Sequence, residues 1–190
     1  MKTAEIRNIS TNVVDCALNI LARCIIDSTF SEYCRERSHA MAVVWVVQSF
    51  ELFLKAKIFD KSPYSVFPNK SRDIDFINDN SINIHLLPQI FKKLFNIDVN
   101  KKQFEKIIKI RNSLTHFGIT WTDFSYEALK FIFDVFIPIL EKDFPNDLNH
   151  LMNCLGYRDE GIFEWYLIEQ LDLHKIQYSI FIKNKFISNG

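Results

Sequence analysis

An arginine and a histidine lie five positions apart near the end of a predicted helix, at Arg111 and His116. Asn112 follows the arginine, and Ser113 and Thr115 place hydroxyl groups between the two. Histidine suits proton transfer because it titrates near physiological pH, and arginine suits a phosphate because its planar fork binds two oxygens and stays charged. Metal-free RNA cleavage needs these groups: one to take the proton of a ribose 2′-OH, a donor for the leaving oxygen, and positive charge on the phosphate.

Helical geometry separates the two main groups. Residues five apart on a regular helix point about 140° away from each other, so Arg111 and His116 do not project side by side unless the last turn loosens before Gly118. A two-fold dimer resolves this, because two copies of the helix end can supply two arginines and two histidines to one cleft. We therefore expect a homodimer whose interface includes the C-terminal end of this helix.

The segment that carries these groups has apolar residues at helical spacing and a glycine suited to a C-cap. The stretch Arg111-Asn112-Ser113-Leu114-Thr115-His116 resembles the R-x4-6-H signature of the HEPN superfamily (higher eukaryotes and prokaryotes nucleotide-binding), which lies near the end of a late helix in a small α-helical domain. The apolar positions are Phe104, Ile107, Ile108, Ile110 and Leu114, and the glycine is Gly118.

The resemblance implies a metal-independent endoribonuclease that works as a homodimer without a cofactor. His116 would be the general acid and base, Arg111 would stabilise the phosphate, and Asn112 would orient the phosphate or His116. Toxin–antitoxin or anti-phage defence, with a cognate antitoxin or defence partner, is implied by the resemblance alone. Some HEPN toxins carry a tyrosine two residues after the histidine, which a paired antitoxin modifies. This chain has Gly118 there, which puts that route of regulation in doubt.

Four further residues are weaker candidates for RNA or phosphate contacts. Ser113 and Thr115 could each add a hydroxyl, although both positions are also typical of a solvated helix. Glu51 and Lys55 are spaced i, i+4 in the order that favours an ion pair. A surface ion pair explains them, and the resemblance offers an alternative, since HEPN proteins often carry polar residues on the helix that faces the catalytic one.

Composition bounds the class of protein. A chain of 190 residues with 48% hydrophobic content can bury one full core, and 18 Phe against 4 Gly favour packed helices over a turn-rich β architecture. Lys+Arg and Asp+Glu are each 23, so attraction to nucleic acid must come from a local patch. The neutral charge and the lack of basic stripes favour the main alternative, a non-catalytic HEPN-like module that binds a nucleotide or a protein partner. A third interpretation is a structural subunit that docks on a larger complex.

The spacing of the cysteines bears on metal binding, and the composition of the first twenty residues bears on the cellular location. The four cysteines have no C-x-x-C pair, which argues against a zinc framework or a disulfide scaffold. His150 and Cys154 are spaced i, i+4, but no third ligand is recognisable, so we expect a structural role and no metal. The first twenty residues contain Glu5, Arg7 and Asp15, so no signal peptide is predicted and a cytoplasmic setting is expected, without a membrane.

The apolar patterning predicts an all-α, single-domain helical bundle with a short helical or extended C-terminal extension. Residues 1–144 form the bundle and residues 145–190 the extension of the same domain, with Pro145 at the boundary. Pro88 should interrupt one helix and Pro138 should bend another, whose many apolar residues belong to the core or to a dimer surface. Helices are expected from Ser10 or Thr11 to 27, over 32–59, 82–95 and 100–117, from Thr122 or Asp123 to 140, and over 147–155 and 161–173. A turn-rich stretch fills 60–81, and a strand-like tail spans 176–187.

Overall fold

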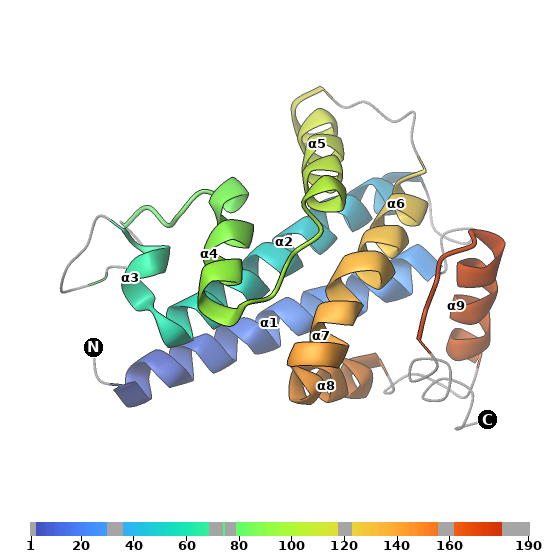
Figure 1. Cartoon of the computed structure of the whole chain (residues 1–190). Coiled ribbons are helices and arrows are strands. Elements are labelled where there is room, and N and C mark those ends of the chain that lie inside the picture. Colours follow the sequence, from blue (N-terminus) through green and yellow to red (C-terminus); the bar gives the residue numbers. More distant parts are fainter. Residues whose placement is uncertain are drawn as a thin grey trace.

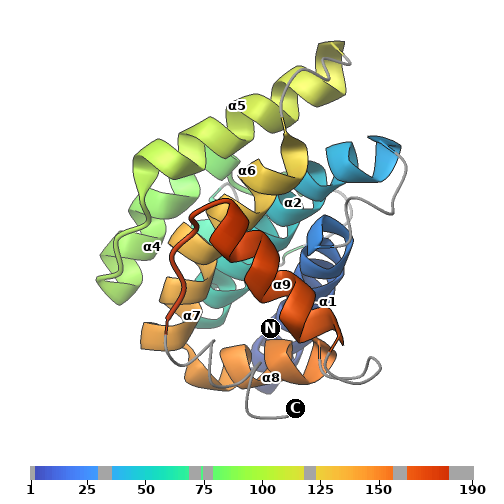
Figure 2. The same ribbon diagram turned by 90° about the vertical axis from the view of Figure 1, so that its right-hand side faces the viewer.

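The computed structural model describes residues 3–29, 36–68, 74, 79–117, 123–155 and 162–179. All regular structure in these ranges is helical, which confirms the predicted all-α bundle (Figures 1 and 2). The α-helices are α1 (Thr3–Thr29), α2 (Glu36–Lys61), α3 (Pro63–Val66), α4 (Leu87–Phe95), α5 (Lys101–Phe117), α6 (Phe124–Phe131), α7 (Ile137–Asp143), α8 (Pro145–Leu155) and α9 (Ile162–Leu173).

The two long helices α1 and α2 lie side by side as an antiparallel pair and form the base of the bundle (Figure 1). Among the described side chains, three donors cross between them, each reaching the backbone carbonyl of an alanine on the other helix. Because alanine is small, the two helices can approach closely enough for these bonds to form. The pairs repeat every seven residues: Ser10 Oγ to Ala56 O at 2.9 Å, Ser49 Oγ to Ala17 O at 2.7 Å, and Cys24 Sγ to Ala42 O at 3.2 Å.

Phe50 on α2 is the centre of the aromatic core. Its ring is fully buried and meets Phe104 of α5 at 5.8 Å, Phe131 of α6 at 5.2 Å and Phe136 at 4.8 Å between ring centroids, all edge to face. Edge-to-face contacts are a favoured arrangement for aromatic pairs. The motif helix α5 therefore packs on α2, and the contact between Phe50 and Phe104 is part of this interface.

The phenylalanine-rich stretch after Asp123 does not form one regular helix. A π-helical turn, Ile132–Phe136, separates α6 from α7, and Pro138 lies in the first turn of α7. Proline has no N–H for an intrahelical bond, and a widened turn is a known way for a helix to accommodate the disruption. The apolar side chains of this stretch are buried in the chain's own core, so they leave no excess for a partner. Of the two explanations given for them, the core and a dimer surface, the burial of these side chains supports the core.

Several predicted helix boundaries hold and two do not. Asn100 Oδ1 accepts from the N–H of Gln103 at 3.2 Å, and Asp123 Oδ1 accepts from the N–H of Tyr126 at 2.9 Å, as expected of N-caps. Pro88 lies in the first turn of α4, which begins at Leu87, instead of interrupting a helix, because proline fits the first turn, where its missing N–H costs nothing.

The other boundary that differs is the start of α1. The helix already begins at Thr3, so Ser10 and Thr11 lie inside it. The hydroxyl of Ser10 bonds across to α2, and that of Thr11 bonds to the carbonyl of Arg7, so neither caps the helix. The stretch predicted as turn-rich over 60–81 contains α3, and the part of it at 69–73 and 75–78 lies outside the described residues.

The C-terminal helices pack onto the bundle. Helix α8 contacts α1 and α7, and α9 contacts α1. Lys57 of α2 forms an ion pair with Asp147 of α8 at 2.6 Å, and its ammonium lies over the rings of Phe53 and Phe144. Residues 176–179 of the tail are described and form no strand, while the rest of the strand predicted to 187 lies outside the described residues.

Helix α1 alone meets the length and hydropathy criteria of a membrane span among the described residues. The window within Ala4–Thr29 has a mean hydropathy of 1.5, and 50% of it is buried inside the protein. A core helix meets the same criteria, and α1 contributes eight positions to the core: Val14, Ala17, Leu18, Leu21, Ala22, Cys24, Ile25 and Ile26. The finding is therefore weak support for a membrane span.

Candidate functional site

Arg111 lies on the side of α5 that faces the bundle. The helix is regular from Lys101 to Phe117, so positions seven apart nearly share a face, and Arg111 follows the buried Phe104 at that spacing. The side chain is half-buried, and its Nε is fully buried without an acceptor among the described residues. A buried N–H donor without an acceptor costs about 1–3 kcal/mol, so this group is a candidate for binding an anion.

His116 lies on the other side of α5 and is exposed. The helix remains α-helical to Phe117, so the last turn does not loosen and the separation of about 140° from Arg111 persists. The C-terminal end of α5 projects beyond the other helices at the top of both Figure 1 and Figure 2. Within one chain, α5 therefore presents Arg111 toward the bundle and His116 toward the outside.

The polar residues around the motif have a mixed arrangement. Asn112 and Ser113 are half-buried, and Thr115 is exposed. The Thr115 hydroxyl is directed at its own helix, where it lies 3.0 Å from the carbonyl oxygen of Arg111 and 3.2 Å from that of Asn112. The hydroxyl proton is therefore used in a hydrogen bond within the helix, and Thr115 can only accept a hydrogen bond from a ligand.

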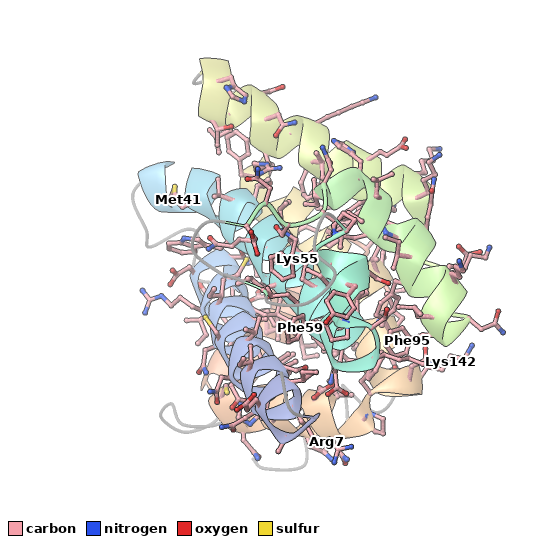
Figure 3. All side chains as sticks on the ribbon, turned by 90° about the vertical axis from the view of Figure 1, so that its left-hand side faces the viewer. Arg7, Met41, Lys55, Phe59, Phe95 and Lys142 are labelled. Atoms are coloured by element: carbon pink, nitrogen blue, oxygen red, sulfur yellow. The ribbon has the colours of Figure 1, made fainter. Side chains whose placement is uncertain are left out.

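Glu51 and Lys55 form an ion pair on α2, with Lys55 Nζ 2.5 Å from Glu51 Oε1. The same ammonium donates to Ser81 Oγ at 2.8 Å, which ties α2 to the segment that leads into α4. Lys55 lies on the face of the molecule shown in Figure 3. The structure thus brings these two residues together with Ser81. The expected ion pair is present, but its side chains are only 19% and 26% exposed, so it is partly buried and not a fully exposed surface pair.

Three lysines on α5 were missed as a group by the sequence reasoning. Lys102, Lys106 and Lys109 are all exposed, and their i, i+4, i+7 spacing places them on the face opposite to the buried Phe104. The expectation that the chain lacks a basic stripe is therefore wrong. The signal was visible in the sequence, but the neutral total charge concealed it.

His150 and Cys154 lie on the face of α8 toward α1. His150 Nε2 is 3.7 Å from Asp15 Oδ1, too far for a hydrogen bond, and burial followed by the charge of Asp15 raises the pKa of the Cys154 thiol. A thiol with a raised pKa is a poor nucleophile and a poor metal ligand. Among the described residues, no group of three or more His, Cys, Asp or Glu is placed to hold a metal ion.

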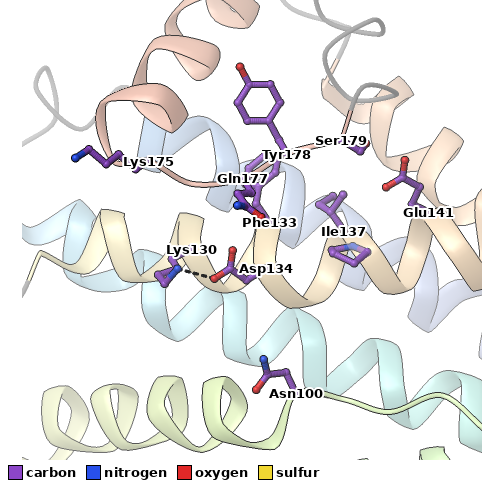
Figure 4. Close-up of a pocket in the computed structure, with 11 residues that line it drawn as sticks. Asn100, Lys130, Phe133, Asp134, Ile137, Glu141, Lys175, Gln177, Tyr178 and Ser179 are labelled. Carbon is purple, nitrogen blue, oxygen red and sulfur yellow. Dashed lines mark hydrogen bonds and ion pairs between the residues drawn. The ribbon is translucent and has the colours of Figure 1, made fainter.

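A groove of about 620 Å³ lies on a different part of the molecule, between α6–α7 and the tail (Figure 4). On the helical wall of the groove, Lys130 and Asp134, spaced i, i+4, form an ion pair at 2.6 Å, and Asp134 raises the pKa of Lys130. The tail closes one side through Gln177 and Tyr178, and the Tyr178 hydroxyl donates to Asp172 at 3.0 Å. Its charged side chains are two lysines and two carboxylates, so the groove is not selective for an anion.

The end of α5 is thus the candidate site. It combines an arginine with a buried unsatisfied donor, an exposed histidine on the opposite side, and a row of exposed lysines that leads toward that histidine. No protein-family model matches the chain, and no curated protein or solved structure matches it either.

Proposed function

We propose that the protein is a metal-independent endoribonuclease of the HEPN type, with Arg111 and His116 as its catalytic residues. The observation that carries the proposal is the Nε of Arg111, which is buried and has no acceptor among the described residues. A guanidinium with an unmatched donor gains a partner when its side chain reaches a phosphate oxygen, and charge-assisted bonds of this kind are among the strongest hydrogen bonds in proteins.

The chemistry follows from the residue types. His116 takes the proton of a ribose 2′-OH, whose oxygen attacks the adjacent phosphorus, and a second proton transfer from histidine releases the 5′-oxygen. Positioned general acid–base catalysis of this type is worth roughly 10²- to 10⁴-fold in rate. Arg111 offsets the negative charge that builds up on the phosphate oxygens, and Asn112 orients the phosphate or the imidazole.

The proposed active form is a two-fold homodimer. Because the regular helix α5 holds Arg111 and His116 about 140° apart, one chain cannot present both to one phosphate from this helix alone. The projecting end of α5 can meet its two-fold copy, so that Arg111 of one chain and His116 of the other face a common groove. The groove must admit water and the RNA phosphate, since a buried unpaired charge is costly.

The biological setting is an extension of the same proposal. Endoribonucleases with this motif act in toxin–antitoxin or anti-phage defence, which requires a cognate antitoxin or other partner to restrain them. Gly118 in place of a modifiable tyrosine argues for restraint by binding instead of by covalent modification. A cytoplasmic location fits such a role.

Cleavage of single-stranded RNA in the presence of EDTA tests the function. We expect wild-type protein to cleave with undiminished rate under chelation, and His116→Ala to lose at least about 100-fold. His85→Ala is the matched control, because His85 is an exposed histidine on another element and its loss should leave the rate unchanged. Loss of activity on chelation, or full activity in His116→Ala, contradicts the mechanism.

The geometry also favours a second candidate function, a non-catalytic module that binds a nucleotide or a protein partner. In that case Arg111 alone binds an anion, and the opposite orientation of His116 has no catalytic meaning. Wild-type protein would bind nucleotide or RNA without cleaving it, and binding would survive His116→Ala but not Arg111→Ala.

A further inference from the structure

Helix α5 and its neighbour α4 concentrate positive charge in one part of a neutral chain. Residues 87–117 contain seven Lys and Arg but only two Asp and Glu, a local net charge of +5, whereas the whole chain sums to zero. A lobe of this kind attracts polyanions regardless of the total charge, because exposed charges more than about 10 Å apart are largely screened at physiological salt.

The exposed cations of α5 form a straight row. Lys102, Lys106 and Lys109 recur at i, i+4 and i+7, and the same phase continues to Ser113 and His116. Helical rise separates the three lysines by about 6 Å and about 4.5 Å along the axis. These steps are comparable with the distance between successive phosphates of a single strand, so one strand can follow the row.

Two of the three lysines are uncompensated. Lys106 Nζ is 2.6 Å from Glu127 Oε1, but Lys102 and Lys109 have no carboxylate partner among the described residues. The lysine of this pair is half-exposed, but Glu127 is only 11% exposed, so breaking the pair would leave its carboxylate largely buried and unpaired. A phosphate meets no such competitor at Lys102 and Lys109.

We propose that this lysine row, Lys102, Lys106 and Lys109, binds the phosphate backbone of single-stranded RNA and leads the strand to His116. The row fits one strand, because it is a single line of charges on one helix. A lipid surface fits less well, since interfacial helices also insert an apolar face. The large apolar side chains that are exposed in the described part of the chain lie on other elements: Met41, Tyr64, Leu86, Trp165 and Leu173.

The delivery of the strand to His116 rests on the proposed function, whereas binding by the row does not. The test therefore uses His116→Ala protein, which cannot cleave, and a fluorescent oligouridylate whose anisotropy reports binding over a range of KCl concentrations. In this background the double variant Lys102→Gln/Lys109→Gln removes the two uncompensated cations. The control is Lys142→Gln/Lys175→Gln, which removes two exposed lysines from other elements.

We expect the slope of log affinity against log salt to decrease in magnitude by about 1.4, since each phosphate contact with a single strand contributes about 0.7. Affinity near 0.1 M salt should fall on the order of tenfold, and the control should bind as its parent does. Circular dichroism identical to the parent confirms that both variants are folded. Unchanged affinity and slope in the Lys102/Lys109 variant, or an equal loss in the control, overturns the proposal.

Two further measurements separate the outcomes. Binding to vesicles of phosphatidylcholine and phosphatidylserine that exceeds binding to RNA, and depends on the same lysines, overturns the assignment to RNA. Cleavage is measured with His116 intact in the same lysine variants. If RNA binds through the lysine row but the wild type does not cleave it, the proposed function fails and the binding proposal holds. If the wild type cleaves RNA and the lysine variants bind it as their parent does, the binding proposal fails and the proposed function holds.

Discussion

Arg111 and His116 are five residues apart on α5 and point to opposite sides of it, Arg111 toward the bundle and His116 outward. The regular helix between them keeps this angle fixed, so no rotation of the side chains alone brings both groups to one phosphate. A catalytic role for both residues in one site requires a second copy of the helix. This relationship makes complementation between chains the most direct test.

Mixing Arg111→Ala and His116→Ala chains should restore activity that neither has alone. If each site takes Arg111 from one chain and His116 from the other, the heterodimer holds one intact site and one doubly damaged site. Equal mixing should then return about one quarter of the wild-type rate, because half of the dimers are heterodimers. The measurement is RNA cleavage after the chains are unfolded together and refolded. A mixture as inactive as its components excludes this composite site.

Substitution of Phe50 should lower the stability of the fold strongly. Phe50→Ala removes a fully buried ring that meets three other rings, and we expect the free energy of unfolding to fall by about 3–5 kcal/mol. Urea unfolding followed by circular dichroism measures it, and Phe50→Leu gives a milder change if the alanine variant fails to fold. Leu173→Ala, at a position 65% exposed, should change stability by less than about 0.5 kcal/mol. Similar losses at both positions would contradict the aromatic core.

The ion pair of Lys57 with Asp147 should contribute more than an exposed pair. Its two side chains are only 20% and 18% exposed, and Lys57 also contacts two aromatic rings. A double-mutant cycle with Lys57→Met and Asp147→Asn should give a coupling of about 1–3 kcal/mol. Lys92 and Asp98 offer a matched pair, at 2.7 Å but 57% and 75% exposed, for which we expect about 0–0.5 kcal/mol. Equal couplings would show that burial does not matter at this contact.

Alkaline pH should destabilise the fold through Cys24. Burial raises the pKa of the Cys24 thiol from 9.0 to about 12, so folding favours the protonated form. This contribution is complete below the pKa of the unfolded chain, about 9, and is lost as pH rises toward about 12. Between pH 9 and 11 the wild type should lose roughly 1–3 kcal/mol more than Cys24→Ala. Urea titrations under reducing conditions measure this.

The exposed Cys16 supplies the control for the alkaline experiment. Cys16→Ala should keep the full pH dependence of the wild type, because its thiol is exposed in both the folded and the unfolded state. A thiol reagent provides an independent readout, since Cys16 should react in the native protein and Cys24 only on unfolding. A wild type and a Cys24→Ala variant with the same slope would contradict the assignment.

The sequence predicted what depends on local rules. The caps at Asn100 and Asp123 and the helix between Lys101 and Phe117 follow from side-chain chemistry and apolar period alone. The angle between Arg111 and His116 was predicted in the same way. What failed depends on three-dimensional packing, because Pro138 marked a disturbance without showing that the helix widens before it into a π-helical turn.

The lysine row illustrates a different reason for failure. Lys102, Lys106 and Lys109 have a clear helical phase opposite to the apolar positions of α5, but the neutral total charge of the chain concealed this local row. The role of Ser10 could not be predicted for another reason, since it depends on its partner Ala56, which is 46 positions away in the sequence. Such pairings are set by how two helices align, and no local pattern specifies that alignment.

The alternation of donors and alanines between α1 and α2 has a consequence for misfolding. Residues 10, 17 and 24 read Ser, Ala, Cys along α1, and their partners 56, 49 and 42 read Ala, Ser, Ala along α2. A slip of one heptad, about 10.5 Å, in one direction would set Ser10 against Ser49 and Ala17 against Ala42. In the other direction it would set Cys24 against Ser49 and Ala17 against Ala56. Two hydroxyls, or a hydroxyl and a thiol, would then crowd one level and leave gaps at the next. The native register of the α1–α2 pair is therefore more stable than the register shifted by one heptad. A chain that first collapses in the shifted register gains stability when it moves to the native one.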